Sequence, residues 1–290
     1  MSDRHFLQQL IKQNNRLSST LPDKALVHHF IDDLFGYLFV PKTGKKQQLA
    51  DLEKEWQSLK SHLNTLIYDV TADGSRSQLT SDLFFEDLPG IYESLQRDAA
   101  SVLENDPAAT QIEEVFLAYP GFYAVAVYRF AHQLSSQGIR ILPRLFTEYA
   151  HSRTGIDIHP GATIGVPFFI DHGTGVVIGE TSIIGDNVKI YQGVTIGALN
   201  SAKDKVADKR HPTIEDNVII YSGATILGGK TVIGRDSVIG GNVWITHNVP
   251  SSSLVYHKSE VIAKEDFSFK ASVDEILKTR KVTTKKVHTE

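Results

Sequence analysis

Two interruptions of a strict six-residue repeat carry the side chains whose types could perform chemistry. The first is the run 171–174, which reads Asp-His-Gly-Thr. The second is the polar segment GALNSAKDKVADKRHP at residues 197–212, which ends near Arg210 and His211. Long polar insertions in a solenoid usually lie on its functional face. We therefore expect the reactive groups of this chain at these two places.

A histidine and an aspartate far apart in the sequence could form a general-base pair. Ile158, Ile164 and Ile170 lie six residues apart, which puts one on each face of a three-sided coil. His172 then falls at the corner that returns to the face on which Asp157 lies. A carboxylate beside an imidazole fixes its tautomer and stabilises the imidazolium. The sequence predicts that His172 deprotonates a substrate hydroxyl with Asp157 as its partner.

Arg210 and His211 suit an anionic substrate group or a developing oxyanion, although a charged loop end would have the same composition. Zinc held by histidines is the rival chemistry on such a scaffold. The histidines of the repeat region form no closely spaced pair, and the chain has no cysteine, so we expect no metal site. These histidines are His159, His172, His211 and His247. No register break accompanies His159, which we expect to be structural.

The repeat itself predicts the scaffold. Isoleucines recur every six residues in the runs 158–170, 178–196 and 214–226. A helix has a period of 3.6 residues and a strand a period of 2, whereas one short strand plus a corner takes six. Glycines that follow the aliphatic residues supply turn conformations. The pattern is typical of a parallel β-helix of hexapeptide repeats, and the alternative is a β-rich domain with a chance period.

Beyond the glycine pair at 228–229 the phase of the repeat is open. Val232 and Val238 continue the six-residue step, while isoleucines fit it after a slip of one residue. Those isoleucines are Ile233, Ile239 and Ile245.

The first half of the chain has a helical period. Segments such as ALVHHFIDDLFGYLF place apolar residues three and four apart, and glycine is sparse before residue 155. We predict an α + β-helix protein with an all-helical N-terminal domain at 1–152. A catalytic β-helix domain follows at 153–250, with a protruding loop at 197–212. The C-terminal segment 251–290 ends in a charged tail that we expect to be disordered.

Composition excludes several classes of function. The chain of 290 residues has 30 basic and 34 acidic side chains and a formal net charge of −4, without the basic excess that nucleic-acid binding needs. No apolar run is long enough for a membrane span or a signal peptide, so we expect a cytoplasmic protein. Without cysteine there are no disulfides, thiolate metal sites or cysteine nucleophiles.

At these residues the chain resembles the serine O-acetyltransferases, over about residues 105–250. The shared segments are DPAA at 106–109, YPGFYAVAVYRFAHQL at 119–134, GIDIHPGATIG at 155–165, DHGTGVVIGET at 171–181, KIYQGVTIGA at 189–198, KRHPTIEDNV at 209–218 and GATILGG at 223–229. The resemblance implies a left-handed β-helix, a homotrimer formed through it, and in some members a dimer of trimers. It also implies acetyl transfer from acetyl-CoA to the hydroxyl of L-serine. The products are O-acetyl-L-serine, on the route to cysteine, and CoA.

The resemblance also implies roles for individual residues. His172 corresponds to the general base and Asp157 to its partner. Asp106 and Asp171 match the carboxylates that bind the amino acid, chiefly its ammonium group.

The same resemblance assigns the remaining binding groups. Arg210 and His211 match the residues that hold the carboxylate and the transition state. Small residues let the pantetheine of CoA approach the backbone. The corresponding positions are Gly197, Ala198, Ser222 and Gly223, with Lys230, Lys203, Lys205 and Lys209 as candidate phosphate contacts.

Two departures from the family leave alternatives open. Residues 1–100 do not match its compact members, which leaves hexamer formation open. The insertion at 199–208 is longer than theirs, which leaves CoA binding and feedback inhibition open. Separately, transfer to another small acceptor, such as homoserine or an amino sugar, stays an alternative, as does a catalytically inactive solenoid. Members of the family bind O-acetylserine sulfhydrylase through a C-terminal isoleucine. The sequence ends in Thr289-Glu290, so we expect no stable complex by that route.

Overall fold

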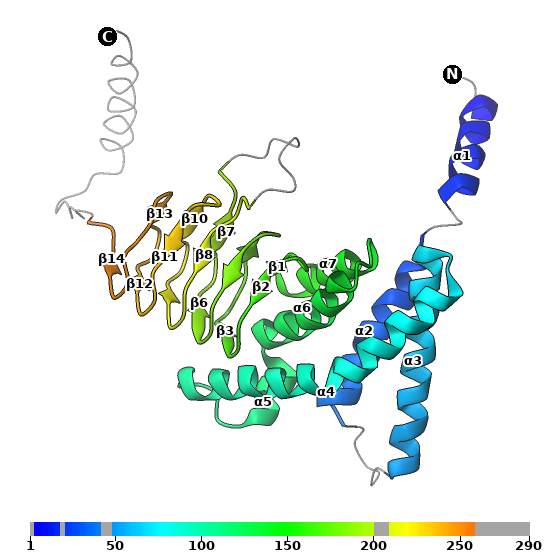
Figure 1. Ribbon diagram of the computed structural model, residues 1–290, viewed down its shortest axis with the longest axis horizontal. Helices are drawn as coiled ribbons and strands as arrows, with labels where there is room; N and C mark the ends of the chain where they lie inside the picture. The colour runs from blue at the N-terminus through cyan, green and yellow to red at the C-terminus, as the bar shows by residue number, and fades with distance from the viewer. Residues whose placement is uncertain (1–2, 18–20, 42–47, 200–208, 259–290) are drawn as a thin grey trace, which may run out of the picture. The chain divides into compact units, whose positions relative to one another are not determined.

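The computed structural model describes residues 3–17, 21–41, 48–199 and 209–258 (Figure 1). The expectations about Lys203, Lys205 and the C-terminal tail lie outside these residues. The chain forms two units, 1–257 and 258–290, and almost all of the second is outside the described part. None of the helices in the described part is both long enough and apolar enough to cross a membrane.

A helical region precedes the β-helix, as the sequence predicts. Its described helices are α1 (Asp3–Leu17), α2 (Lys24–Phe39), α3 (Leu49–Thr71), α4 (Gly74–Asn105), α5 (Ile112–Ala118), α6 (Pro120–Ser136) and α7 (Leu142–Thr154). Pro120 separates α5 from α6 and stands at the first position of α6, where its missing N–H leaves no helical hydrogen bond unmade. Buried aromatic side chains such as Phe30, Phe84 and Phe146 fill the space between the helices.

The second region is a parallel β-helix of short strands. The described strands are β1 (Asp157–Ile158), β2 (Thr163–Ile164), β3 (Phe168–Ile170), β4 (Val177–Ile178), β5 (Ile183–Ile184), β6 (Val188–Ile190), β7 (Thr195–Gly197), β8 (Thr213–Ile214), β9 (Ile219–Ile220), β10 (Thr225–Leu227), β11 (Val232–Ile233), β12 (Val238–Ile239), β13 (Trp244–Ile245) and β14 (Leu254–Val255). They form three sheets, here called A (β1, β4, β7, β10, β13), B (β2, β5, β8, β11) and C (β3, β6, β9, β12, β14). The first four coils each contribute one strand to each sheet in turn (Figure 1). The last coil contributes β13 and β14, and between them Val249 forms only an isolated bridge with Ile233.

The six-residue register agrees with the predicted faces. Ile158, Ile164 and Ile170 lie on sheets A, B and C and are all buried. After residue 229 the isoleucines are the buried series, since Ile233 pairs with Ile214. One extra residue at the glycine pair causes this slip. Strand β14 extends the solenoid beyond the predicted boundary at residue 250.

Helices α4 and α6 cover the open edge of the first coil. The first coil of a solenoid has backbone groups that no preceding strand can pair, and unpaired buried groups are costly. Side chains of the two helices satisfy several of them. The pairs are the Tyr128 hydroxyl to Ala162 O (2.6 Å), Arg129 Nη2 to Gly165 O (2.9 Å) and Phe168 N to Asp98 Oδ1 (2.8 Å). The helical region therefore closes one end of the β-helix.

Candidate active site

Most of the candidate residues lie on two corners of the solenoid, one before and one after the strands of sheet A. The His172 corner joins sheet C to sheet A and consists of residues 171–176, 191–194, 221–224 and 240–243. The His211 corner joins sheet A to sheet B. Its described residues are 159–162, 179–182, 198–199, 209–212 and 228–231.

His172 protrudes from its corner on an inserted pair of residues. The Asp171 N–H donates to Ile190 O, and the Gly193 N–H donates to Thr174 O, both at 2.9 Å. The residues between these paired positions, His172 and Gly173, therefore have no counterpart in the next coil. Both have positive φ, 53° and 82°, and the His172 side chain is 71% exposed. The two-residue shift seen in the sequence thus presents the imidazole to solvent on a backbone held in an uncommon conformation.

Asp106 lies in the same cluster as His172 and Asp171. The carboxylate ends α4, accepts the Tyr119 hydroxyl at 2.6 Å and accepts the Ala108 N–H at 2.8 Å. These hydrogen bonds, first that of Tyr119, hold the pKa of Asp106 below its usual value, and the charge of His172 acts in the same direction. The same hydrogen bond raises the pKa of Tyr119 to about 12, with a further contribution from Asp171.

Asp157 lies beside the His172 corner but is not hydrogen-bonded to His172. The turn 171–175 rests on the segment before Asp157, since the Gly175 N–H donates to Gly155 O at 2.8 Å. The Asp157 carboxylate lies 3.3 Å from the Arg144 guanidinium, and its Oδ1 has no hydrogen-bond partner. His172 Nδ1 instead lies 3.6 Å from Oδ1 of Asp171. The two segments meet as the sequence predicts, and the side-chain pairing stays a prediction.

His211 is buried at its corner and fixed by the preceding coil. Its Nδ1 accepts the Thr181 N–H at 3.1 Å and lies 2.9 Å from the Thr181 hydroxyl. The ring packs against Gly179, where a Cβ would overlap it. Burial, followed by the charge of Arg210, lowers the pKa of His211 to about 4. The imidazole is therefore neutral near pH 7, and since Nδ1 accepts from Thr181, the proton is on Nε2.

Other charged groups surround His211. Arg210 Nη2 forms an ion pair with Glu180, and its backbone N–H donates to the Thr181 hydroxyl at 2.9 Å. Lys209 Nζ donates to Thr181 O at 2.8 Å, so this lysine is engaged with the backbone of the corner. His159 Nδ1 accepts the Gly161 N–H at 3.0 Å, a local bond that agrees with a structural role.

The candidate CoA positions are divided between the same two corners. Gly197, which ends β7, and Ala198 border the His211 corner, on which the exposed Lys230 also lies. Ser222 and Gly223 are on the His172 corner, where Gly223 has φ 71° and lies against Gly193. Sheet A lies between the two sets: Leu227, which pairs with Gly197, is five residues after Ser222, or roughly 16 Å at about 3.3 Å per residue. Within one chain the two halves of the predicted site therefore do not touch.

Several residues at or beside the two corners were not predicted from the sequence. Tyr119 and Thr181 hold Asp106 and His211, and Arg144 lies against Asp157. Tyr191 stacks on Tyr221 with ring centroids 5.0 Å apart, and its raised pKa reflects burial, then Tyr221 and the charges of Asp171 and Asp106. Tyr119 and Tyr191 do stand in the segments that resemble the family, which is the one signal the sequence offered.

One group of metal-ligating side chains is present among the described residues. Donor atoms of Glu148, His151 and Asp157 lie within 4.8 Å of one another. Arg144 forms ion pairs with both carboxylates, so a cation already balances their charge.

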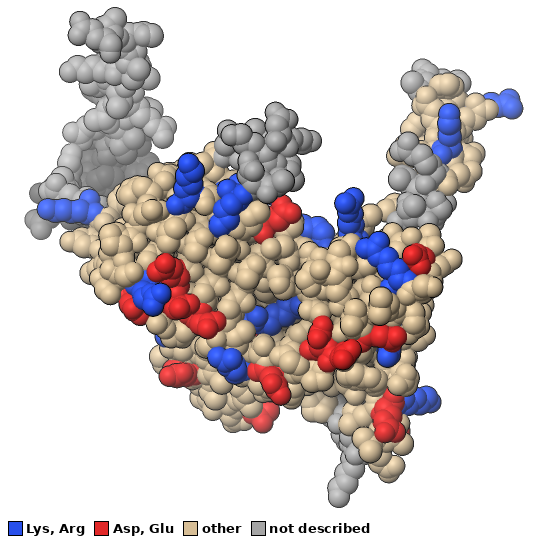
Figure 2. All heavy atoms as spheres, in the orientation of Figure 1, with Lys and Arg blue, Asp and Glu red and all other residues tan. Residues whose placement is uncertain are grey.

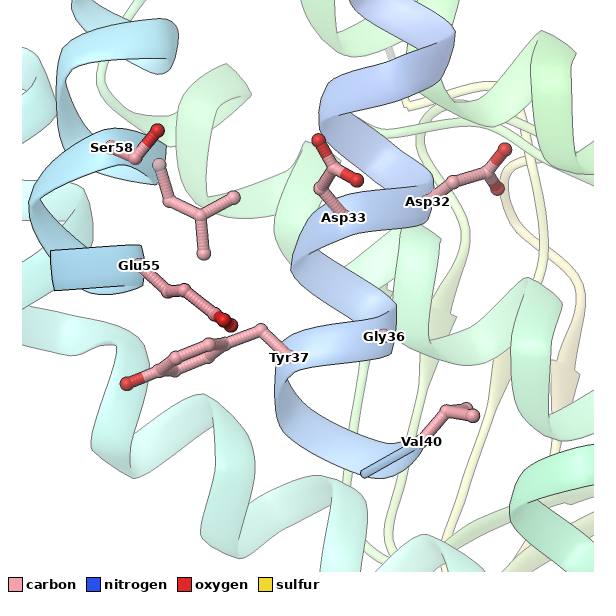
Figure 3. Close-up of a pocket in the computed structure, with 8 residues that line it drawn as sticks. Asp32, Asp33, Gly36, Tyr37, Val40, Glu55 and Ser58 are labelled. Carbon is pink, nitrogen blue, oxygen red and sulfur yellow. The ribbon is translucent and has the colours of Figure 1, made fainter. Parts of the chain in front are cut away.

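Other surfaces contain none of the candidate residues. A cavity of about 260 Å³ lies between α2 and α3, and Figure 3 shows the Glu55 carboxylate beside the Tyr37 ring there, with Asp33 one turn of α2 away. On the face in Figure 2, acidic and basic side chains are interspersed rather than gathered by sign.

This chain is similar to curated proteins and solved structures of one kind. No protein-family model matches this chain. The plasmid serine acetyltransferase of Synechococcus elongatus is 51% identical over 187 residues, which cover 62% of this chain and 58% of that protein. The serine acetyltransferase of Bacillus subtilis is 47% identical over 165 residues, which cover 57% of this chain and 74% of that protein. The chain thus spans a little over half the length of the first relative.

Solved structures give the same fold. Serine acetyltransferase 1 of Entamoeba histolytica, in complex with L-cysteine, aligns with a TM-score of 0.70 and 33% identity over 81% of this chain and 99% of that one. A serine acetyltransferase of Brucella abortus, in complex with coenzyme A, aligns with a TM-score of 0.56 and 28% identity over 78% of this chain and 76% of that one. The predicted fold class, a helical region before a left-handed β-helix, is confirmed.

Proposed function

This chain belongs to the serine acetyltransferase family, and from that premise we propose that it transfers an acetyl group from acetyl-CoA to the hydroxyl of L-serine. The products are O-acetyl-L-serine and CoA. The observation that carries the proposal is the cluster at the His172 corner, where an exposed imidazole lies among the carboxylates of Asp171 and Asp106. Two anions suit the ammonium group of an amino acid, and the imidazole suits its hydroxyl.

His172 is the proposed general base. As the serine oxygen attacks the thioester carbonyl, the imidazole takes the hydroxyl proton, and the tetrahedral intermediate collapses with cleavage of the carbon–sulfur bond. The imidazolium then returns the proton to the CoA sulfur. Asp157 or Asp171 would stabilise the imidazolium, and Asp171 is the nearer in this chain, at 3.6 Å.

Arg210 and His211 are the proposed partners of the serine carboxylate and of the transition-state oxyanion. Arg210 forms an ion pair with Glu180 at this corner, and its planar, permanently charged guanidinium matches a carboxylate in geometry. The Nε2–H of the neutral His211 ring is a single donor on a ring that Thr181 and Gly179 hold in place. A donor that is already oriented needs no reorganisation as charge develops.

We propose that the complete site forms between neighbouring chains of a homotrimer. The His172 corner supplies the base and the ammonium site, and the His211 corner supplies the carboxylate site. The candidate CoA residues are divided in the same way, with Gly197 on one side and Ser222 on the other. A three-fold assembly would place one corner of each chain against the other corner of its neighbour. Whether two trimers associate further depends on the helical region.

Release of CoA from acetyl-CoA tests the function. The acceptors are L-serine, L-homoserine, glucosamine and buffer alone, with the wild-type chain at one fixed concentration. We expect release that requires L-serine and product that elutes as O-acetyl-L-serine. Release with homoserine or glucosamine in place of serine would refute the assigned acceptor, and no release with any acceptor would refute the enzymatic function.

A further inference from the structure

A proline directly after the residue restricts the backbone of both Tyr119 and Asp106. Each directly precedes a proline, Pro120 and Pro107, and each has extended backbone, with φ −86° and ψ 110° for Tyr119 and φ −102° and ψ 109° for Asp106. A following proline disfavours helical backbone, so the sequence itself restricts both residues. The two side chains then meet across α5, with the Tyr119 hydroxyl donating to Asp106 Oδ2 at 2.6 Å.

The hydrogen bonds orient the Asp106 carboxylate and leave some of its acceptor positions available. Oδ1 accepts the Ala108 N–H at 2.8 Å and Oδ2 accepts the phenol, so both oxygens are oriented. A carboxylate has about four acceptor positions, so each oxygen can still accept a bond from an ammonium group. Such an anion binds a cation without first losing side-chain freedom.

Tyr119 is also positioned against the strand that leads into the His172 corner. Gly121, two residues on, lies so close to the carbonyl oxygen of Ile170 that a Cβ there would overlap it. Ile170 ends β3 and directly precedes Asp171 and His172. The start of α6 therefore determines the position of the Tyr119 phenol relative to Asp171. The phenol in turn orients the Asp106 carboxylate.

We propose that Tyr119 is a positioning residue for the amino-acid substrate, which orients the Asp106 carboxylate toward Asp171 so that the two anions receive the substrate ammonium. The inference rests on the proposed function of the His172 corner. In this role Tyr119 acts through its hydrogen bond to Asp106. Its effect should thus appear in amino-acid binding rather than in the chemical step.

The test compares Tyr119→Phe with a matched control, Tyr149→Phe. The Tyr149 hydroxyl donates to Asp32 Oδ2 at 2.7 Å, which is the same type of bond away from both corners. Loss of a hydrogen bond to a charged group corresponds to about a tenfold change in affinity. We expect KM for L-serine to rise about tenfold in Tyr119→Phe, with kcat and KM for acetyl-CoA changed less than about twofold. Tyr149→Phe should match the wild type.

A double-mutant cycle shows whether Tyr119 acts through Asp106. In an Asp106→Asn background, Tyr119→Phe should change KM for L-serine less than about twofold, because the positioned group is already neutral. A full tenfold effect in that background, or an unchanged KM in the single variant, would overturn the inference. Phenylalanine keeps the ring, and melting temperatures check that the fold is retained.

Calorimetric binding of L-serine separates this inference from the proposed function. If the wild type binds L-serine but releases no CoA, the enzymatic function fails while the same cycle, run on Kd, still decides the role of Tyr119. If the wild type does not bind L-serine, the ammonium site is refuted and the inference with it. Turnover with an unchanged Kd and KM in Tyr119→Phe would refute the inference alone.

Discussion

His172 lies against its own neighbour in the chain, with Nδ1 3.6 Å from Oδ1 of Asp171, while Asp157 faces Arg144. The bulge formed by residues 172–173 makes this arrangement adjustable, because the imidazole is 71% exposed and little packs against it. An imidazole with this freedom can rotate toward the substrate and can have either Asp171 or Asp157 as its carboxylate partner.

Replacement of His172 by alanine should abolish most turnover. A positioned general base contributes roughly 10² to 10⁴ in rate, so kcat for serine-dependent CoA release should fall by about that factor. Since the side chain is exposed, the melting temperature should change little. His247→Ala, at another exposed histidine, is the control and should match the wild type. Turnover near the wild-type level in His172→Ala would exclude this residue as the base.

Asp157→Asn and Asp171→Asn should have different kinetic effects. If Asp157 orients the imidazole in the assembled site, its loss should lower kcat at least about tenfold with little change in KM for L-serine. Loss of Asp171, an ammonium partner, should chiefly raise that KM. Steady-state kinetics with L-serine varied at saturating acetyl-CoA distinguish the two. The reverse pattern would make Asp171 the orienting carboxylate, as its position in the single chain suggests.

Mixed trimers should recover activity that each parent variant lacks. Co-expressed His172→Ala and Arg210→Ala chains would each retain one intact corner. In random trimers, about a quarter of the interfaces then join two intact corners, so the mixture should show about a quarter of wild-type activity per site. Size-exclusion chromatography and separate affinity tags identify the mixed species. No recovery in verified mixed trimers would place both corners' contributions within one chain.

The solenoid could be predicted from the sequence because its period is local. Buried isoleucines such as Ile158 and Ile164 recur at fixed steps, and the inserted residues beside His172 appear as a break in those steps. Tyr119 could not be assigned a role this way. Its hydrogen bond to Asp106 forms only because the segment with α5, which lies between the two residues, brings their side chains together.

The electrostatic state of the site likewise depends on tertiary contacts. His211 is neutral because it is buried, at a place where it accepts a hydrogen bond from Thr181, thirty positions earlier in the chain. Arg144 reaches Asp157 only because α7 leads directly into β1. Neither effect follows from residue spacing.

The lowered pKa of His211 should make stability depend on pH. The unfolded histidine titrates near 6.5 and the folded one at about 4, so between these values the unfolded state binds more protons. Stability should therefore fall as pH decreases through this window, by up to about 1.4 kcal/mol per pH unit from this group. The free energy of unfolding can be measured with urea at pH 7, 6 and 5, at one protein concentration. It should change less steeply with pH in His211→Gln than in the wild type. His247→Gln should retain the wild-type slope, and equal slopes in all three would contradict the assigned cause.

Removal of one partner from the buried Asp98–Arg129 pair should destabilise the chain severely. Arg129 Nε and Nη2 donate to the two Asp98 oxygens at 2.6 and 2.9 Å, and the Asp98 side chain is 1% exposed. In Arg129→Met the carboxylate stays buried with the Phe168 N–H as its remaining partner, which corresponds to a loss of about 3–5 kcal/mol.

The matched exposed pair is Lys60–Asp82, at 2.7 Å with 29% and 44% exposure, where Lys60→Met should leave the free energy of unfolding almost unchanged because solvent screens the two charges. Denaturant midpoints give both values. Because Arg129 also caps the first coil through Gly165 O, hydrogen exchange in β2 and β3 should rise in Arg129→Met before exchange in β9 or β12. Uniform loss of protection along the whole solenoid would show that the pair stabilises the fold globally and does not act as a local cap.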